Sequence, residues 1–386
     1  MSCLTLILLI AFAVSPLNVH SAGDDDKRPT APARKDGRKW RIGYVQGGPY
    51  LAYGQYFRRV IQGLMDLGWI ARGELPPPEK DGDNRHVWEW LASEAKSEWI
   101  EFAADAYWSS NWDKELREKT RAEVIPRLAK KQDIDIVIAM GTWAGQDLAN
   151  DLHTVPTVVM CTSNPVESGI IPGIEDSGRD HVHAKISPER YVRQVRLFHE
   201  IIGFKRLGVV YEDTPVGRTY AALNDIRKAA SERGFEVVEC RAPGDLPDKR
   251  QSFENLLACH RELAPKVDAM YLTIHNGLTL DHLPELLEPF NEQKIPTFAQ
   301  RSAEEVRHGV LMSMPSAVTQ PEALFGASVL ARIMNGAVPR RLGQVFEESV
   351  PRIALNMAVA RKIGYDPPGW VLHMADELYT EIETSK

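Results

Sequence analysis

Cysteine is scarce in this chain, with four in 386 residues and no CxxC pair. Cys3 lies in front of the apolar N-terminal run and would leave with it, so Cys161, Cys240 and Cys259 remain, without regular spacing. We expect these three to stay unpaired, and a Cys240–Cys259 disulfide is the alternative. The sequence therefore does not predict a fold held together by disulfides.

Common catalytic motifs are also absent. There is no GxSxG, HExxH, GxGxxG or P-loop, which disfavours several hydrolase, metallopeptidase and nucleotide-binding classes. His181 and His183 lack a carboxylate or cysteine at a zinc-ligand spacing, and His275 has no evident carboxylate partner. We predict no metal, cofactor or catalytic residue, although an enzyme is an open alternative because a doubly wound fold does not decide function.

An excess of positive charge is missing as well. Lysine and arginine number 46 against 53 acidic residues, so the net charge is -7. The isoelectric point of about 5.9 is acidic. A surface for nucleic acid needs a basic patch, and none is predicted.

The first 22 residues contain no Lys, Arg, Asp or Glu and are largely apolar. This is typical of an export signal, and Ser21 to Gly23 offer small residues for cleavage. The apolar run is too short for a membrane anchor of about 20 residues. Cys3 precedes the run, where a lipid-modified cysteine could not follow a signal. We expect 1–22 to be a cleaved signal peptide and the charged, proline-bearing 23–39 to be a flexible leader.

Strand-like and helix-like segments alternate from residue 40 onward. Apolar runs such as 136–139 suit strands covered on both faces, and amphipathic stretches such as 53–67 suit helices on a sheet. This rhythm predicts an α/β protein of two doubly wound parallel-sheet lobes, joined by a multi-strand hinge and separated by a ligand cleft. The predicted lobes are 40–165 plus about 315–342, and 166–314 plus about 343–386.

Several connections are predicted from local composition. The chain should cross between the lobes near 166–185, 314–317 and 340–346. Segment 71–98 contains three consecutive prolines and interrupts the alternation, so it is interpreted as a surface insertion. The helix that starts at Pro215 is predicted to run on to a glycine stop at Gly234.

Small polar residues follow two neighbouring strands. Thr142 comes after one apolar run, and Thr162, Ser163 and Asn164 come after the next. Ligands of open α/β sheets bind outside the carboxyl ends of the strands. The alternative is that these residues are ordinary caps and turn formers. Two such clusters in succession favour one wall of a ligand crevice.

Longer motifs carry a resemblance to a known family. They are IGYVQGGPY, VIAMGTWAGQDLAN, VPTVVMCTSNPVESGII, LGVVYEDTPVGRTYAALNDIRKAASERGFEVV, DAMYLTIHNGL, KIPTFAQ and NMAVARKIGYDPPGWVLHMADEL. Over about 40–380 the chain resembles the ABC-transporter substrate-binding proteins of the tryptophan/tyrosine-binding type, a branch of the type I periplasmic binding proteins. It departs from the family pattern at Trp143, Asn164 and Glu167, on the presumed ligand wall, which leaves the ligand open.

The resemblance implies a ligand site built from both lobes. Hydroxyls and helix N-termini would receive a carboxylate, and Asp213 or Glu167 would face an ammonium, so the ligand would be an amino acid or similar zwitterion. The implied ligand-binding residues are Gln46, Tyr50, Thr142, Trp143, Thr162, Ser163, Asn164, Tyr211, Asp213, Thr214, Asn276 and Gln300.

The resemblance also implies a location and a partner. The protein would be a periplasmic, monomeric solute-binding protein that delivers its ligand to an ABC transporter permease in the inner membrane. A ligand-sensing partner of a membrane receptor is the alternative, since both functions use the same closing cleft.

Overall fold

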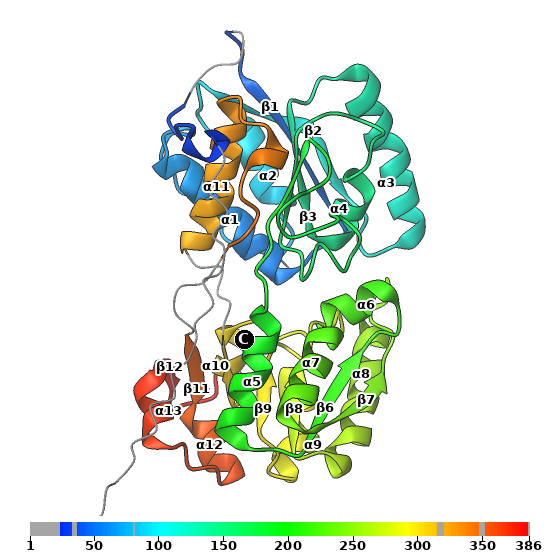
Figure 1. Ribbon diagram of the computed structural model, residues 1–386, viewed down its shortest axis with the longest axis vertical. Coiled ribbons are helices and arrows are strands. Elements are labelled where there is room, and N and C mark those ends of the chain that lie inside the picture. The colour runs from blue at the N-terminus through cyan, green and yellow to red at the C-terminus, as the bar shows by residue number, and fades with distance from the viewer. Residues whose placement is uncertain (1–23, 33–36, 80–81, 315–319, 347–351, 385–386) are drawn as a thin grey trace, which may run out of the picture.

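The computed structural model describes residues 24–32, 37–79, 82–314, 320–346 and 352–384. They form two α/β lobes, one above the other in Figure 1, and each lobe has a sheet between helices. The chain begins in the upper lobe, enters the lower lobe at α5 (Arg190–Ile202), returns through α11 (Gln320–Met334) and ends in the lower lobe. The predicted fold class of two parallel-sheet α/β lobes is confirmed.

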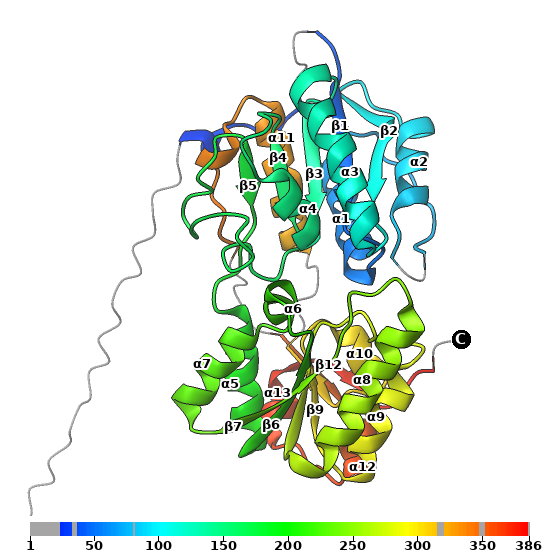
Figure 2. The same ribbon diagram turned by 90° about the vertical axis from the view of Figure 1, so that its right-hand side faces the viewer.

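The first lobe holds a five-stranded sheet in the order β2-β1-β3-β4-β5, and every neighbouring pair is parallel. Figure 2 shows this sheet face-on. Its strands are β1 (Trp40–Gln46), β2 (Ile100–Ser109), β3 (Ile136–Met140), β4 (Thr157–Met160) and β5 (Val182–Ala184). Both faces are covered, by α1 (Leu51–Asp66), α2 (Arg85–Ser93) and α11 on one side and by α3 (Lys114–Pro126), η2 (Arg127–Lys131) and α4 (Gly141–Leu148) on the other.

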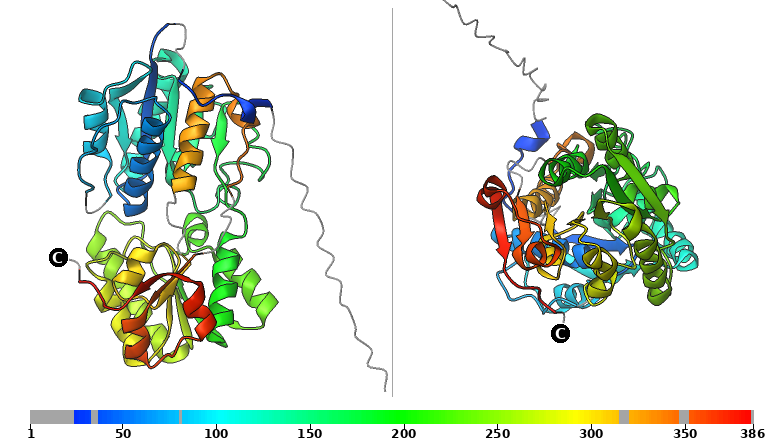
Figure 3. Two further views of the ribbon diagram at one scale, coloured as in Figure 1. Left: turned by 90° about the vertical axis from the view of Figure 1, so that its left-hand side faces the viewer. Right: turned by 90° about the horizontal axis from the view of Figure 1, so that it is seen from below.

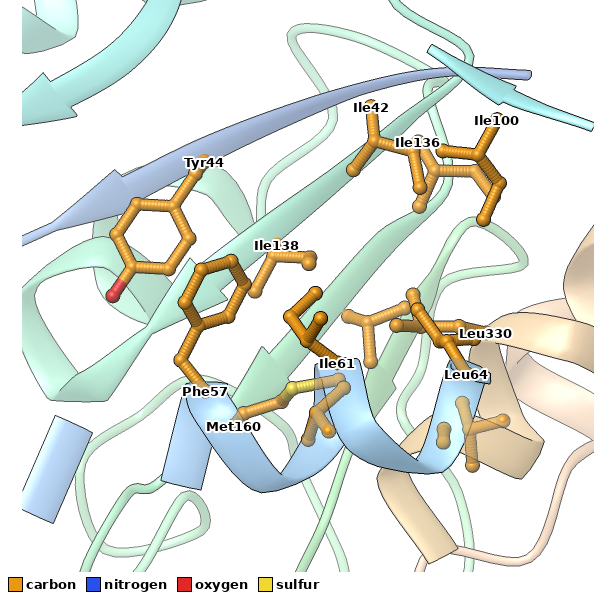
Figure 4. Close-up of a cluster of buried hydrophobic side chains, with 14 of the residues drawn as sticks. Ile42, Tyr44, Phe57, Ile61, Leu64, Ile100, Ile136, Ile138, Met160 and Leu330 are labelled. Atoms are coloured by element: carbon orange, nitrogen blue, oxygen red, sulfur yellow. The ribbon is translucent and has the colours of Figure 1, made fainter. Parts of the chain in front are cut away.

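The inner strands β3 and β4 are apolar because they are buried on both sides. Side chains alternate along a strand, so Ile138 of β3 faces α1 while its neighbour Val137 faces α3 and α4. Helix α1 packs on this face of the sheet through Phe57 and Ile61, which lie one turn apart, and Figure 4 shows both close to Ile138. Leu330 of α11 belongs to the same core, which explains why α11 packs in the first lobe although it follows the second.

Segment 71–98 was predicted to be a surface insertion, and this is wrong for residues 85–93. Residues 85–93 form α2, which buries Val87, Trp88 and Leu91 in the first-lobe core. The indole Nε1 of Trp88 donates to the carbonyl oxygen of Ala103 in β2 at 3.0 Å. The three prolines before α2 suggested an irregular segment, so the short amphipathic helix that follows them was not predicted.

The second lobe holds a seven-stranded sheet in the order β12-β11-β10-β9-β8-β6-β7. Its pairs are parallel except β10 with β11, so the sheet is mixed rather than wholly parallel. The strands are β6 (Arg206–Tyr211), β7 (Glu236–Arg241), β8 (Ala269–Leu272), β9 (Thr297–Ala299), β10 (Met312–Ser313), β11 (Ile353–Asn356) and β12 (Ala375–Tyr379). The helices of this lobe are α5, α6 (Pro215–Tyr220), α7 (Leu223–Arg233), α8 (Lys249–Leu263), α9 (Leu283–Glu292), α10 (Ala303–Arg307), α12 (Met357–Ile363) and α13 (Gly369–Met374).

The single helix predicted from Pro215 to Gly234 is two helices. Ala222, between α6 and α7, has a left-handed backbone with φ of 52°. Gln300 donates its amide Nε2 to the carbonyl oxygen of Tyr220, the last residue of α6, at 2.9 Å. Gln300 and Tyr220 are 80 residues apart in the sequence. The residues around Ala222 therefore give no signal of this contact.

Cys240 and Cys259 form a disulfide, which corrects the expectation that they stay unpaired. Cys240 lies on β7 and Cys259 on α8, with their Cα atoms 5.7 Å apart. The pairing depends on how α8 packs against β7, which the spacing of 19 residues does not reveal. Cys161 is the free thiol among the cysteines that the structure describes.

Residues 24–32 pack on the first lobe, so the predicted flexible leader is wrong for this part. The Asp25 carboxylate accepts from the backbone N–H of Val338 at 3.3 Å, and that of Asp26 accepts from Gly343 at 3.1 Å. Trp69 donates its indole N–H to the carbonyl oxygen of Thr30 at 2.8 Å. Figure 3 shows this segment beside α11.

The chain crosses between the lobes at the edge of the first sheet. β5 still pairs with β4, so the chain leaves the first lobe after residue 184, later than the predicted boundary at 165. Ile186 bridges Val345 of a second crossing, and its N–H donates to the carbonyl oxygen of Gln344 at 2.9 Å. The crossing predicted at 314–317 lies mostly outside the described residues, between β10 and α11.

Candidate functional site

One cavity between the lobes is lined by the carboxyl ends of strands from both sheets, and we call it the interlobe cavity. The first lobe contributes Tyr50, Tyr53, Tyr56, Trp112, Thr142, Cys161, Thr162, Ser163, Lys185 and Glu322 to its wall. The second lobe contributes Arg190, Tyr191, Glu212, Tyr220, Gly244, Asp245, His275, Asn276, Gln300 and Arg301. Its position is the one expected for ligands of open α/β sheets.

The first-lobe wall combines aromatic rings with hydroxyl groups. Tyr50 and Tyr53 open α1, and their rings meet edge to face with centroids 5.1 Å apart. Thr142 stands in the first turn of α4, where backbone N–H groups favour an anion. The hydroxyl of Thr162 is buried and has no hydrogen-bond partner among the described residues. A buried hydroxyl without a partner is costly, so a ligand group would satisfy it.

Gly141 permits the close approach of Tyr53 to α4. Its φ of +85° suits glycine, and a Cβ placed there would lie 1.7 Å from the Tyr53 hydroxyl oxygen. The tyrosine thereby reaches the first turn of α4, directly beside Thr142. A glycine at the end of β3 thus shapes the wall of the cavity.

Two carboxylates of the second lobe face the cavity. Glu212 follows β6, and its Oε2 accepts from the backbone N–H groups of Gly244 at 3.2 Å and Asp245 at 2.8 Å. Asn276 donates its Nδ2 to Oδ1 of Asp245 at 2.6 Å. Burial, followed by the charge of Glu212, raises the pKa of Asp245 to about 7. A positively charged ligand group would offset both the burial of the Asp245 carboxylate and its repulsion by Glu212.

Lys185, Arg190 and Glu322 lie together at the hinge side of the cavity. Lys185 directly follows β5, and its ammonium pairs with the Glu322 carboxylate, both side chains being buried. The Lys185 Nζ is also 5.7 Å from the ring of Phe346 on a neighbouring crossing. Burial raises the pKa of the adjacent Cys161 thiol to about 12, so the thiol is neutral.

Arg301 and α6 join the two lobes around the cavity. The Arg301 guanidinium lies 5.4 Å from the centre of the Tyr50 ring across the cleft. Val216 of α6 packs against the first-lobe core, and Asn224 donates its amide to Glu167 at 3.1 Å. These contacts place the lobes against each other over the cavity.

Half of the ligand residues implied by the sequence line the interlobe cavity. They are Tyr50, Thr142, Thr162, Ser163, Asn276 and Gln300. Gln300 is fully buried and uses its amide within the second lobe, where Oε1 accepts from the N–H of Ile274 at 2.9 Å. It therefore acts as a support for the wall.

Three implied residues of the first lobe do not line the cavity. Gln46 is buried behind it, and its Oε1 accepts from the Tyr44 hydroxyl at 2.9 Å. Trp143 packs edge to face on the cavity residue Trp112, with ring centroids 5.5 Å apart. Asn164 forms a turn by accepting from the N–H of Val166 at 3.1 Å.

Three implied residues of the second lobe also lie outside the cavity. Tyr211 donates its hydroxyl to Glu239 at 2.9 Å. Asp213 pairs with Arg218 at 2.9 Å between carboxylate and Nε, and Thr214 caps α6. The ammonium partner expected at Asp213 is thus not brought to the cavity, whereas the neighbouring Glu212 is.

The sequence interpretation missed most of the charged cavity residues. A signal was present, because Lys185 directly follows β5, Glu212 directly follows β6 and Arg301 lies two residues after β9. The rule that places ligands at the carboxyl ends of strands would have included all three. Asp245 is harder to find, since it lies four residues beyond β7.

Among residues 24–32, 37–79, 82–314, 320–346 and 352–384, no three His, Cys, Asp or Glu side chains gather as a metal site would require. Within the same ranges, no helix has both the length and the apolar character needed to traverse a bilayer.

Comparison with known proteins decides the family. Residues 110–379 match the family described as ABC transporter substrate binding protein, which is most of the chain. The chain belongs to this family. A curated relative, the tyrosine-binding protein of Clostridioides difficile, is 23% identical over 167 residues, which are 43% of this chain and 45% of the relative. The chain thus aligns with less than half the length of that relative.

Solved structures share the fold of this substrate-binding protein. An ABC domain from Streptococcus pneumoniae in complex with L-Trp is 16% identical, with a TM-score of 0.67, covering 88% of this chain and 99% of the other. A ligand-free, open substrate-binding protein with adhesive properties from Clostridium difficile is 18% identical, with a TM-score of 0.58, covering 89% and 100%. At these identities the likeness concerns the two-lobed architecture.

Proposed function

We propose that this substrate-binding protein captures a small zwitterion, an amino acid or a compound of similar charge, and delivers it to an ABC importer. The proposal rests on the interlobe cavity. Its wall holds the carboxylates of Glu212 and Asp245 from the second lobe, the hydroxyls of Thr162 and Ser163 from the first, and the basic side chains of Lys185 and Arg190 near the hinge. A zwitterion satisfies both kinds of group, and buried charges need such partners.

In the proposed complex, the ligand ammonium lies against Asp245 and Glu212. Its carboxylate lies against the hydroxyls of Thr162 and Ser163 and the guanidinium of Arg190. The neutral His275 does not compete for the ammonium, because burial lowers its pKa and its ring nitrogens bond to backbone groups at Ala242 and Gly277. The amino-acid ligands of the relatives are consistent with this assignment.

The direct test is to identify the molecule that the protein retains. Native mass spectrometry of gently purified protein, followed by denaturation, should release one small molecule that carries both an amine and an acid. Calorimetry with that molecule and the stripped protein should then give a single site per chain. Release of a sugar, nucleotide or metal ion instead would contradict the proposal.

We also propose that the protein works outside the cytoplasm after removal of residues 1–22. The Cys240–Cys259 disulfide supports this location, because structural disulfides form and persist in oxidising compartments. Amino-terminal sequencing of the exported protein should give a first residue near Gly23, within the range from Ser21 to Gly23. An intact Met1 or a lipid-bearing cysteine in that protein would overturn the proposal.

A further inference from the structure

We propose that Tyr220 contacts the captured solute and that its hydroxyl forms a hydrogen bond with it. The inference rests on the proposed capture of an amino acid or similar zwitterion in the interlobe cavity. It adds to that site a residue of the second lobe that selects for a polar group on the solute.

Buried hydroxyl groups without a hydrogen-bond partner gather at the interlobe cavity. Among the described residues, the hydroxyls in this class are those of Tyr50, Thr162, Tyr220 and Tyr365. All but Tyr365 line the cavity. Burying a hydroxyl without a partner is unfavourable, so their concentration around one cavity indicates that a ligand supplies the partner.

Each lobe contributes one hydroxyl that a ligand must satisfy. Tyr50 lies against the Arg301 guanidinium, which is 5.4 Å from the centre of its ring. Thr162 then remains from the first lobe, with 7% of its surface exposed, and Tyr220 remains from the second. A solute that bonds to both hydroxyls connects the two lobes.

Helix α6 places Tyr220 between the lobes. Figure 2 shows this helix on the side of the second lobe that faces the first, and Tyr220 is its last residue. Val216 on the same helix packs against the first-lobe core. Gly217 allows a close approach to the end of β6, because a Cβ there would lie 2.4 Å from the carbonyl oxygen of Glu212. Helix α6 is therefore in contact with both lobes.

The backbone around Tyr220 is fixed by a buried glutamine. Gln300 is fully buried, and its Nε2 donates to the carbonyl oxygen of Tyr220 at 2.9 Å. Its Oε1 accepts from the N–H of Ile274, also at 2.9 Å. The left-handed Ala222 then separates α6 from α7. Tyr220 is thus held in place before the solute arrives, which lowers the entropy cost of binding.

The Tyr220 hydroxyl is neutral at physiological pH. Burial raises the pKa of Tyr220 well above its usual value, and the charge of Asp245 raises this pKa further. A protonated phenol both donates and accepts hydrogen bonds. The hydroxyl can therefore bond to either charged group of a zwitterion.

Tyr220→Phe removes this hydroxyl and keeps the ring. A thermal-shift screen of the twenty common L-amino acids at millimolar concentration, on full mature protein stripped of retained solute, first identifies the strongest binder. Calorimetry with that amino acid should give a dissociation constant about fivefold higher or more in Tyr220→Phe than in wild type, because one hydrogen bond to the solute is lost. The ligand-free variant should melt no lower than wild type, since the hydroxyl has no partner among the described residues.

Tyr365→Phe is the matched control. The hydroxyl of Tyr365 is likewise buried without a partner in the described part of the chain, but its ring packs on the second-lobe core and does not line the cavity. Its removal should leave the dissociation constant of the same amino acid unchanged.

The outcomes separate this inference from the proposed function. Equal affinities of wild type and Tyr220→Phe overturn the Tyr220 contact and leave amino-acid capture standing, because the amino acid still binds. Equal losses of affinity in Tyr220→Phe and Tyr365→Phe also overturn the contact, since the effect then does not depend on the cavity. Binding of none of the twenty amino acids contradicts amino-acid capture itself and this inference with it.

Discussion

Replacing Asp245 by asparagine should weaken solute binding about 30-fold or more. The substitution keeps the shape of the side chain but removes the buried charge that answers the ligand ammonium, and losing one partner of such a pair costs roughly 2 to 5 kcal/mol. Calorimetry with the solute that the protein retains measures the effect. The melting temperature of the ligand-free variant shows that it still folds.

Asp213→Asn is the matched control for this substitution. Asp213 is also a second-lobe carboxylate beside Glu212, but it pairs with Arg218 outside the cavity. Its loss should leave the dissociation constant nearly unchanged, because an exposed ion pair contributes little. Equal losses of affinity in Asp245→Asn and Asp213→Asn would remove Asp245 from the ligand site.

The same carboxyl group should make binding depend on pH. Asp245 titrates near pH 7 in the ligand-free protein, where it faces Glu212, Lys249, Lys114 and Asn276. A bound ammonium favours the ionised form and lowers this pKa, so binding releases a proton. The dissociation constant should fall by up to about tenfold per pH unit as the pH rises toward 7, and this slope should vanish in Asp245→Asn.

Linkage also gives the sign for the stability of the ligand-free protein. The pKa of Asp245 is higher in the folded protein than its usual value, so the folded form binds the proton more tightly. Its contribution to stability is present at acidic pH and is lost as the pH rises through about 7. Binding and stability therefore change in opposite directions with pH.

Gly141→Ala should lower the free energy of unfolding by roughly 3 kcal/mol. A left-handed backbone costs a non-glycine residue about 1 to 2 kcal/mol, and forcing a methyl group against the buried Tyr53 adds about 1 to 3 kcal/mol. The Cβ would lie 1.7 Å from the Tyr53 hydroxyl oxygen, so Tyr53 or α4 must move. Urea unfolding of the two proteins measures the difference.

Gly169→Ala isolates the backbone part of this effect. Gly169 has a similar φ of +70°, but no heavy atom lies within 4 Å of a Cβ built there. Its loss should therefore be only about 1 to 2 kcal/mol. Equal destabilisation by the two substitutions would show that Tyr53 can move away from the added methyl group without a loss of stability. Solute affinity should fall in Gly141→Ala alone, because only that change displaces a cavity wall.

The architecture could be predicted because its signals are local. Ile136 to Ala139 are apolar on both faces, as a strand between two helix layers requires, and the periodicity of 53–67 matched α1. The resemblance to a substrate-binding family rested on motifs in the same elements. Of the polar residues after β3 and β4, Thr142, Thr162 and Ser163 line the interlobe cavity.

Details that depend on distant partners were not predicted. The Cys240–Cys259 disulfide, the break at Ala222 and the attachment of 24–32 each require a contact with a segment remote in the fold or the chain. Composition described 71–98 and 23–39 as polar and proline-bearing, but it could not show that residues 24–32 and 85–93 pack against the first lobe.

By itself, the sequence determined the alternation of strands and helices, the two lobes and the strand ends at which a ligand should lie. These features follow from apolar runs and turn residues, and both can be recognised in short stretches of consecutive residues. The tertiary structure alone decided which of the neighbouring carboxylates lines the cavity. Glu212 and Asp213 are adjacent carboxylates just after β6, yet Glu212 lines the cavity and Asp213 pairs with Arg218. The chain turns at Asp213, where the N–H of Thr214 donates to the carbonyl oxygen of Glu212 at 2.8 Å, and this turn separates the two side chains. Asp245 joins Glu212 only because the β7 loop folds back beneath the first lobe, which places two acids in one buried site.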